Sequence, residues 1–284
     1  MIRILTPGPL ALLQDHGRPG LAHLGVPRSG AADLLSHDLA NRLVGNDVDE
    51  ATIEFLLGSA ELVFESGAHI AVTGAETSVR VDGCEMPLNQ ALHVPAGGHL
   101  RIGAPFRGLR CYLAVAGGFA VPPVLGSRSS DVLAHLGPAA LKAGDTLPIG
   151  TPGLPPPSPD VVRSTVPFEE RLSLRYRRGP RDDWFDAAAL SGFEEESWTV
   201  TSEANRVGVR LAGAPVVPID HEEMPSEGMV LGAIQVPASG QPIVFMADHP
   251  PTGGYPVIGV VDALSVARLA QAAPGTSVSF EPIH

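Results

Sequence analysis

The stretch Ala60-Glu61-Leu62-Val63-Phe64-Glu65-Ser66-Gly67-Ala68-His69-Ile70-Ala71-Val72 holds two short apolar runs on either side of a serine–glycine turn. Short runs of apolar and β-branched residues bounded by turn residues are typical of β-strands, so the pattern predicts strands over 60–65 and 69–72. The same pattern predicts further strands over 51–56, 77–81, 90–94, 99–102 and 110–115. Strands at this spacing, with Asp82-Gly83 as a hairpin turn, indicate a closed or nearly closed antiparallel barrel.

Upstream of these strands the pattern changes. Residues 2–5 read as a strand that ends at a Thr-Pro-Gly turn, and residues 10–30, rich in glycine and proline, are predicted to form a loop. Leucines at i, i+4 and i+8 spacing predict a helix over 31–43. Ser29 or Asp33 is suited to begin that helix, because each offers a side-chain oxygen to the free N–H groups of its first turn.

The second half of the chain has similar ingredients. Two short helices are predicted, over 181–190 and 262–272. The same reasoning predicts strands over 173–177, 198–201, 209–211, 232–236, 242–246, 257–261 and 277–281. The proline block at 152–159 fits neither a central strand nor a helix, because proline fixes φ and donates no hydrogen bond. We therefore expect a domain over 1–150, a proline-rich linker over 151–166 and a second domain over 167–284.

Composition excludes several classes of protein. Glycine (32) and proline (28) make up about a fifth of the 284 residues, which is too many for a helical bundle, so a mainly β protein with a few short helices is expected. The net charge of −12 makes nucleic acid an unfavourable partner. No run approaches the roughly 18 apolar residues that a membrane span needs, and we expect a cytoplasmic protein with no membrane partner.

The sequence offers few lysines and cysteines for covalent chemistry and no recognised histidine motif for a metal. Lys142 is the single lysine, and Cys84 and Cys111 read as free thiols in a reducing compartment. The ten histidines form no H-x-H or H-E-x-x-H pattern, so no metal site is predicted. The serine-hydrolase motif G-x-S-x-G and the phosphate-binding P-loop are likewise missing from the sequence.

Polar side chains gather in five glycine-rich segments, where the backbone can approach a ligand closely. Their candidate residues are Gln14, Asp15 and Arg18; Ser29 and Asp33; Ser127 and Arg128; Asn205 and Arg206; and Asp248 with Thr252, Gly253, Gly254 and Tyr255. Arginine in such a loop suits bidentate binding of a carboxylate. Each segment also has a purely structural interpretation, as a loop tied by an internal ion pair, a helix cap or a β-turn.

Taken together and in order, these segments resemble one family: the 5-oxoprolinase C subunit, also called KipA-like, allophanate hydrolase subunit 2 or biotin-dependent carboxyltransferase-related. The resemblance rests on seven motifs that span nearly the whole chain. They are Leu13–Gly20, Leu24–Asp33, Ala40–Asn46, Gly126–Ser129, Asn205–Leu211, Gly232–Pro237, which contains Gln235, and Thr252–Pro256.

The resemblance implies two cyclophilin-like β-barrel domains and a heteromeric enzyme. It implies two protein partners, a KipI-like chain (the B subunit) and a LamB/YcsF-like chain (the A subunit). The assembly would open the lactam of 5-oxoproline to glutamate at the expense of ATP, which the partners would help to use, and this chain would be inactive alone. We expect this chain to carry no covalently bound cofactor, with biotin entering only through a partner in the carboxyltransferase alternative. Small amides and lactams are the substrate class that polar loops with an arginine would suit.

Within that family, Asp15 and Asp248 are the candidate catalytic residues, able to orient or deprotonate an amide nitrogen. The other polar residues named above, with Gln235, are candidates for substrate binding. The resemblance also leaves two alternatives open: a carboxyltransferase component that receives CO₂ from a biotinylated partner, and a KipA-like regulator that binds a KipI-like kinase inhibitor. Pro250-Pro251 departs from the family, which usually has a polar Gln-Thr pair there, and Pro138-Ala139-Ala140 stands where a Gly-Arg is usual.

Overall fold

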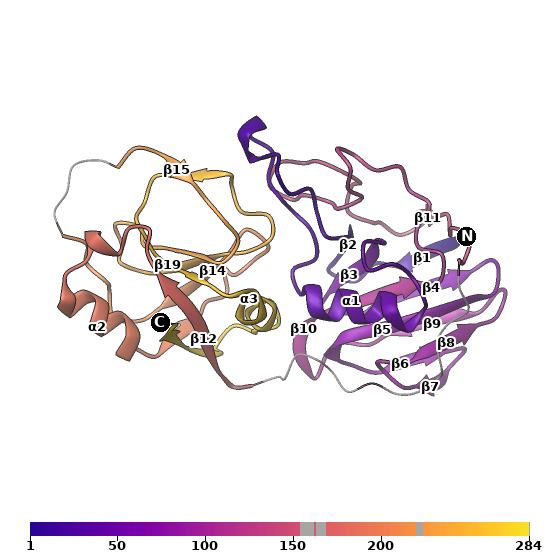
Figure 1. The fold of residues 1–284 in the computed structure, drawn as a ribbon. Helices are drawn as coiled ribbons and strands as arrows, with labels where there is room; N and C mark the ends of the chain where they lie inside the picture. The colour runs from indigo at the N-terminus through magenta and orange to yellow at the C-terminus, as the bar shows by residue number, and fades with distance from the viewer. Residues whose placement is uncertain (154–161, 163–168, 220–223, 284) are drawn as a thin grey trace. The chain divides into compact units, whose positions relative to one another are not determined.

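The chain folds into two compact units, and we describe each by itself (Figure 1). The computed structural model describes residues 1–153, 162, 169–219 and 224–283. The first unit comprises Met1–Arg18, Ser29–Asp131 and His135–Pro167, and the second comprises Pro19–Arg28, Val132–Ala134 and Phe168–His284. Most of the linker predicted over 151–166 lies outside the described residues.

The first unit holds two antiparallel sheets. Its strands are β1 (Ile2–Thr6), β2 (Leu10–Gln14), β3 (Thr52–Leu56), β4 (Ala60–Phe64), β5 (Ala68–Glu76), β6 (Val79–Val81), β7 (Cys84–Met86), β8 (Ala91–Val94), β9 (His99–Ile102), β10 (Arg107–Val115) and β11 (Thr146–Leu147). One sheet has the order β11-β1-β4-β9-β6-β7 and the other the order β2-β3-β10-β5-β8. The predicted hairpin turn is present, with Asp82 and Gly83 both at positive φ between β6 and β7.

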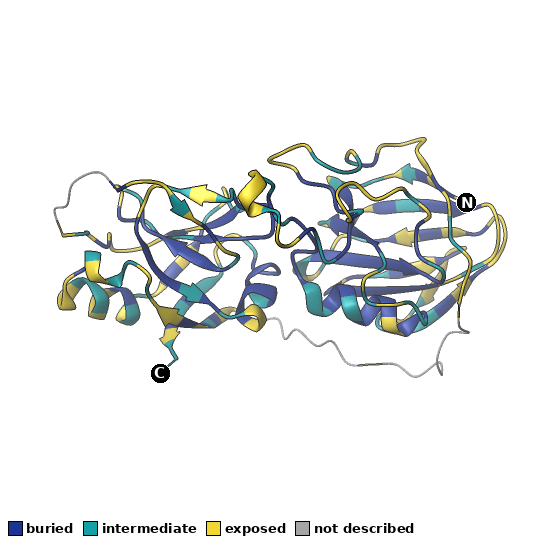
Figure 2. Cartoon of the chain, turned by 45° about the horizontal axis from the view of Figure 1, so that its top comes forward, coloured by how far each residue is buried: buried dark blue, intermediate teal, exposed yellow. Residues whose placement is uncertain are grey.

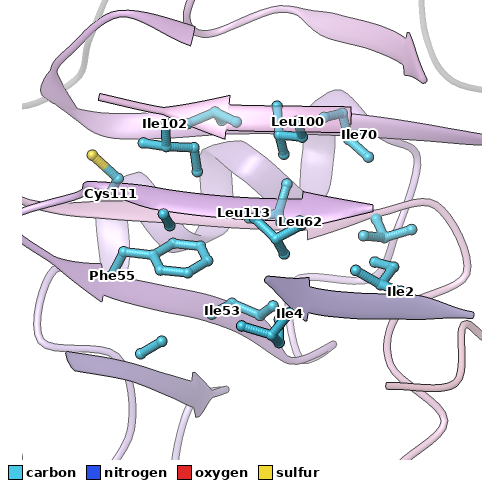
Figure 3. Packing of buried hydrophobic residues seen from close by; sticks show 14 of the residues in the cluster. Ile2, Ile4, Ile53, Phe55, Leu62, Ile70, Leu100, Ile102, Cys111 and Leu113 are labelled. Atoms are coloured by element: carbon cyan, nitrogen blue, oxygen red, sulfur yellow. The ribbon is translucent and has the colours of Figure 1, made fainter. Parts of the chain in front are cut away.

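The core of the first unit lies between its two sheets (Figure 3). Apolar side chains from β1, β4 and β9 meet those from β3, β5 and β10. Ile4, Ile53, Phe55, Leu62 and Leu113 are all fully buried there. Outer strands alternate between buried and exposed residues, as β9 does, and Figure 2 shows exposure concentrated at turns and edges. The strands predicted from short apolar runs bounded by turn residues are therefore present in this unit.

A helix covers the outer face of the second sheet. Helix α1 (Leu34–Leu43) begins at Asp33, whose carboxylate accepts hydrogen bonds from the Ser36 N–H at 3.1 Å and the Ser36 hydroxyl at 2.6 Å. Leucines and alanines of α1 pack against Ala71, Tyr112 and Ala114 of β5 and β10. These strands are therefore buried on both faces.

The second unit is a closed seven-stranded barrel. Its strands are β12 (Arg171–Arg178), β13 (Trp198–Val200), β14 (Gly208–Ala212), β16 (Ala233–Gln235), β17 (Ile243–Phe245), β19 (Val257–Val261) and β20 (Ser277–Pro282), in the order β12-β19-β16-β17-β14-β13-β20. Strand β20 closes the barrel by pairing in parallel with β12. Outside it lie the small sheet of β15 (Glu227–Gly228) and β18 (Thr252–Gly253), the helices α2 (Ala187–Glu195) and α3 (Ala263–Leu269), and the 3₁₀ turns η1 (Ala22–Leu24) and η2 (Asp182–Trp184).

The mainly β class with a few short helices is confirmed, and two local predictions were wrong. Residues 10–14, predicted as loop, form strand β2, because the buried run Leu10-Ala11-Leu12-Leu13-Gln14 pairs fully with β3. The helix predicted over 181–190 is instead η2 followed by α2, which begins at the N-cap Asp186. No helix within the described ranges is long and apolar enough to cross a membrane.

Candidate functional site

Asp15 is the centre of a buried polar cluster in the first unit. Its Oδ1 accepts hydrogen bonds from the Gly17 N–H at 2.7 Å and from the hydroxyls of Ser127 and Ser129, both at 2.6 Å. Its Oδ2 accepts from the Arg128 N–H, also at 2.6 Å. A carboxylate has about four lone-pair positions. The acceptor capacity of Oδ1 is therefore used by the protein, whereas Oδ2 accepts one described hydrogen bond. Ser127, Arg128 and Ser129, which help to fix the carboxylate, lie more than 100 positions away in the sequence.

Arg18 ties the same loops together from inside. Its side chain is buried, and it donates to the Ser29 hydroxyl at 3.0 Å and to the Ser129 carbonyl at 2.6 Å. Ser29 in turn donates to Asp131 at 2.5 Å. Arg18 was predicted to bind a substrate carboxylate, but its guanidinium donates hydrogen bonds to the protein's own loops.

Gln14 and Arg128 are the members of this cluster with capacity left for a ligand. Gln14 donates to the Ser130 carbonyl at 2.9 Å, while its buried Oε1 has no hydrogen-bond partner among the described residues. Arg128 donates from Nε to the Val121 carbonyl at 2.7 Å, its Nη1 lies 3.7 Å from Glu50, and 29% of its side chain is exposed. Arg128 is therefore the most accessible of the three arginines predicted to bind a carboxylate.

Asp33 acts as a helix cap in this structure. Its carboxylate is fully buried against Ser36 and its own N–H donates to the Tyr112 hydroxyl at 2.8 Å. These contacts match the structural interpretation given above for the segment that contains Ser29 and Asp33.

A buried network beside α1 escaped the sequence analysis. Glu54 Oε2 accepts from the Tyr112 hydroxyl at 2.8 Å and from the Ala32 N–H at 3.0 Å, and Arg110 lies 3.4 Å from Oε1. Burial, followed by the Glu54 and Asp33 charges, raises the pKa of Tyr112 well above its usual value. The available signal was the single charge in the apolar strand sequence Thr52-Ile53-Glu54-Phe55-Leu56, since a buried charge requires partners.

Asp248 in the second unit is held by Arg206 in a bidentate ion pair. Arg206 Nε and Nη2 lie 2.9 and 2.8 Å from the two carboxylate oxygens, and both side chains are buried. The Val132 N–H, which belongs to the same unit, donates to Asp248 at 3.2 Å. The pair joins the loop before β14 to the turn after β17. Arg206 neutralises the charge of Asp248 and holds both segments in place. The carboxylate lone pairs that face Arg206 are therefore not available for the general-base role predicted for Asp248.

Most of the remaining candidates of the second unit are exposed, and Gln235 is buried. Asn205 is exposed, and its Oδ1 accepts from the Val207 N–H at 2.8 Å. Gln235 is buried and donates to the Tyr255 carbonyl at 3.3 Å, while half of the Tyr255 side chain is exposed. Thr252 and Gly254 are exposed as well.

The segment of Pro250, Pro251 and Gly253 makes close contacts with neighbouring residues. A Cβ on Gly253 would lie 2.6 Å from Gln235 Nε2, so a larger residue here would have to displace the Gln235 side chain. The carbonyl of Pro251 accepts from the Met229 N–H at 2.8 Å, and that of Pro250 lies 2.8 Å from His249 Nδ1. The two prolines therefore contribute hydrogen-bond acceptors through their carbonyl groups.

Two hollows on the described surface lie away from these candidates. One of about 410 Å³ is lined by Glu61, Arg80, Asp82, Gly83, His99 and Arg101 on the outer face of the six-stranded sheet. The other, of about 630 Å³, lies beside β14 in the second unit, with Arg210 and Gln241 in its wall. Neither hollow is lined by a residue predicted from the sequence to be catalytic or to bind substrate.

Comparisons with known proteins agree on one family. A family model described as "Carboxyltransferase domain, subdomain A and B" matches residues 24–282. The chain is 36% identical over 99% of its length to the 5-oxoprolinase C subunit of Escherichia coli (strain K12), and the match covers 90% of that protein. A second protein of that name, from Haemophilus influenzae, is 33% identical over the full chain and is covered to 91%.

Longer proteins contain a similar region. The urea amidolyase of Saccharomyces cerevisiae is 32% identical over 99% of this chain, which spans 16% of that protein. Among solved structures, TTHA0988 has a TM-score of 0.90 at 36% identity, and this chain covers 55% of it. The Kluyveromyces lactis urea carboxylase has a TM-score of 0.91 at 29% identity, with 27% of it covered.

Proposed function

This chain belongs to the carboxyltransferase-domain family with subdomains A and B, and on that premise we propose that it is the C subunit of a 5-oxoprolinase. The observation that carries the proposal is its similarity to two bacterial proteins of that name along almost the entire length of both chains. The proposed reaction adds water across the lactam C–N bond of 5-oxoproline to give glutamate, coupled to ATP hydrolysis.

The chain is proposed to work only within a complex. Its sequence has no P-loop, so the ATP-using chemistry is assigned to the assembly with two further chains, one KipI-like and one LamB/YcsF-like. No covalently bound cofactor is needed for this role. A cytoplasmic location is proposed with it.

Within the first unit we assign contact with the substrate carboxylate to Arg128. Arg18 is buried and tied to Ser29 and Ser129, whereas Arg128 is partly exposed and its Nη1 has only a long contact with Glu50. A guanidinium with free donors can accept a carboxylate in two parallel hydrogen bonds. The Asp15 carboxylate, which binds the Arg128 N–H, acts as the positioning group for that segment.

The test is turnover by the reconstituted complex. Glutamate release that requires both 5-oxoproline and ATP supports the proposal. Arg128→Gln is expected to raise KM for 5-oxoproline by about tenfold or more, since a hydrogen bond to a charged group contributes about 1.5–3 kcal/mol. The matched control is Arg101→Gln, an exposed arginine of β9 paired with Glu61, which should leave turnover unchanged.

A second candidate function is supported by the relatives named urea amidolyase and urea carboxylase. In that role the chain is a carboxyltransferase component that moves CO₂ from the carboxybiotin of a partner to urea or another amide. Carboxylation of urea by a biotinylated complex, without glutamate release from 5-oxoproline, would select it. Tight pairing with a KipI-like protein and no turnover of either substrate would instead favour the regulatory alternative.

A further inference from the structure

Three metal-ligating side chains converge in the first unit beside the Asp15 cluster. His16 Nε2 lies 2.7 Å from Asp38 Oδ1, and His37 Nδ1 lies 3.1 Å from the same oxygen. One ligand atom from each of the three residues falls within 4.8 Å of the others. The search for histidine motifs missed this group because His16 and His37 are separated along the sequence, and the fold brings them together.

The backbone holds both histidines firmly. His16 follows β2, where the Asp15 carbonyl accepts from the Ala31 N–H at 2.8 Å. A Cβ on Gly30 would lie 3.0 Å from the His16 carbonyl carbon, so this crossing is tightly packed. His37 lies in the first turn of α1, is fully buried, and its ring meets the Tyr112 ring edge-on with centroids 6.4 Å apart. The cluster is therefore preorganised.

The surroundings of His16 favour a cation at its Nε2. Its other ring nitrogen, Nδ1, lies 3.1 Å from Asp49 Oδ1. A histidine that ligates a metal commonly donates its second N–H to a carboxylate, which fixes the tautomer. If Nδ1–H donates to Asp49, the Nε2 lone pair faces the Asp38 carboxylate, and the two electron-rich groups repel each other. A cation bound between them would attract both.

We propose that His16 Nε2, His37 Nδ1 and Asp38 Oδ1 bind a divalent transition-metal ion of the zinc type, with Asp49 as the positioning residue for His16. Bonds of about 2.0–2.2 Å at tetrahedral angles place ligand atoms about 3.3–3.6 Å apart. The separations of 2.7 and 3.1 Å from Asp38 would open by less than about 1 Å, and the two histidine nitrogens, which lie within 4.8 Å of each other, would adjust to the same spacing. Two histidines and one carboxylate leave a coordination position open to solvent.

One cation of the protein competes for the same carboxylate. Arg42 Nη2 lies 3.8 Å from Asp38 Oδ2, but 67% of its side chain is exposed. Because it contacts the oxygen that the histidines do not use, its long and exposed pairing is a weak obstacle. An ion bound at Oδ1 would join the loop of Asp15 and Arg18 to α1. This proposal is independent of the substrate of the enzyme.

The test is calorimetric titration of the full chain, without an affinity tag and stripped by a chelator, with Zn²⁺. We expect one equivalent to bind and to raise the thermal unfolding midpoint, because a ligand that binds only the folded state stabilises it. His16→Ala should abolish that equivalent. Asp49→Asn should weaken it about 10- to 100-fold, and because Asp49 is 77% exposed this variant remains informative if His16→Ala fails to fold.

The matched control is the other histidine pair of this unit. His69 and His93, both exposed on β5 and β8, have ring centroids 5.1 Å apart. His93→Ala should leave the stoichiometric site and its affinity unchanged. Two results would overturn the proposal. In the first, the wild type binds one equivalent of Zn²⁺ and both His16→Ala and Asp49→Asn bind it equally well. In the second, the wild type itself binds Zn²⁺ only as weakly as these variants are expected to. The second result would identify the cluster as a structural contact of His16 and His37 with Asp38.

Discussion

At the scale of single residues, the buried carboxylates Asp15 and Asp248 are held by backbone, hydroxyl and guanidinium donors. Asp15 accepts four hydrogen bonds and Asp248 faces a buried guanidinium. Such groups are costly to bury without partners and rigid once they have them. Their contribution to function is therefore expected to act through the loops that they hold in place.

Replacing Asp15 should affect stability first. In Asp15→Asn one acceptor oxygen becomes an NH₂ group that faces donors, and we expect a loss of about 2–4 kcal/mol of unfolding free energy. Urea unfolding followed by circular dichroism measures it. Asp145→Asn is the matched control, because that exposed carboxylate accepts a single described bond, from the Lys142 N–H. Unchanged stability together with lost turnover would restore a catalytic role for Asp15.

The two cysteines should differ sharply in reactivity. Both are free, as expected, but Cys84 is exposed whereas Cys111 is buried in the core. Burial raises the pKa of Cys111 to about 12, so its thiolate is scarce at pH 8. Alkylation of the native protein at pH 8, read by mass spectrometry, should modify Cys84 alone. Cys84→Ser should then remain unmodified until denaturant is added, and early labelling of Cys111 would contradict the core assignment.

At the scale of elements, α2 is fixed to the barrel by aromatic packing and one acidic side chain. Phe193 of α2 stacks on Phe280 of β20 with ring centroids 4.5 Å apart. Glu194 of α2 accepts from the Tyr176 hydroxyl at 2.5 Å and from Arg178 Nη2 at 2.7 Å, both on β12. The polar contacts set the position of a helix that buries only Phe193.

Alkaline pH should loosen this contact. Burial, followed by the hydrogen bond to Glu194, raises the pKa of Tyr176 above its usual value of about 10. A raised pKa gives stability that is present below about pH 10 and is lost as the pH rises, since the unfolded chain releases the proton first. The unfolding midpoint of the wild type should therefore fall more steeply above pH 10 than that of Tyr176→Phe. Parallel slopes would show that Tyr176 does not contribute.

The same scale explains why β2 and α2 were misassigned from the sequence. The run over 10–14 is apolar without alternation because β2 pairs with β3 and most of its residues are buried. The residues that follow it in the sequence are rich in glycine and proline, so the whole segment over 10–30 was predicted as loop. In the second half, the two aspartates at 182–183 form a separate 3₁₀ turn, and the helix cap is Asp186.

At the scale of the whole molecule, each unit carries its own core. Ile53 of β3 and Ile258 of β19 are both fully buried, one in each unit. Truncating either to alanine should cost about 2–5 kcal/mol. We expect hydrogen exchange, read by mass spectrometry, to accelerate mainly in the unit that carries the substitution. Equal acceleration in both units after either substitution would show that they unfold together.

The sequence by itself determined the mainly β class, most strands, the presence of a helix within 31–43 and the family resemblance. These follow from local signals: apolar periodicity, turn residues and short motifs act over a few residues. Tertiary structure alone decided that Asp15 accepts hydrogen bonds from serines 112 and 114 positions away and that Arg206 neutralises Asp248. It also decided that His16 meets His37 and Asp38. Pairing between distant side chains depends on strand order and loop crossings, which no local periodicity records.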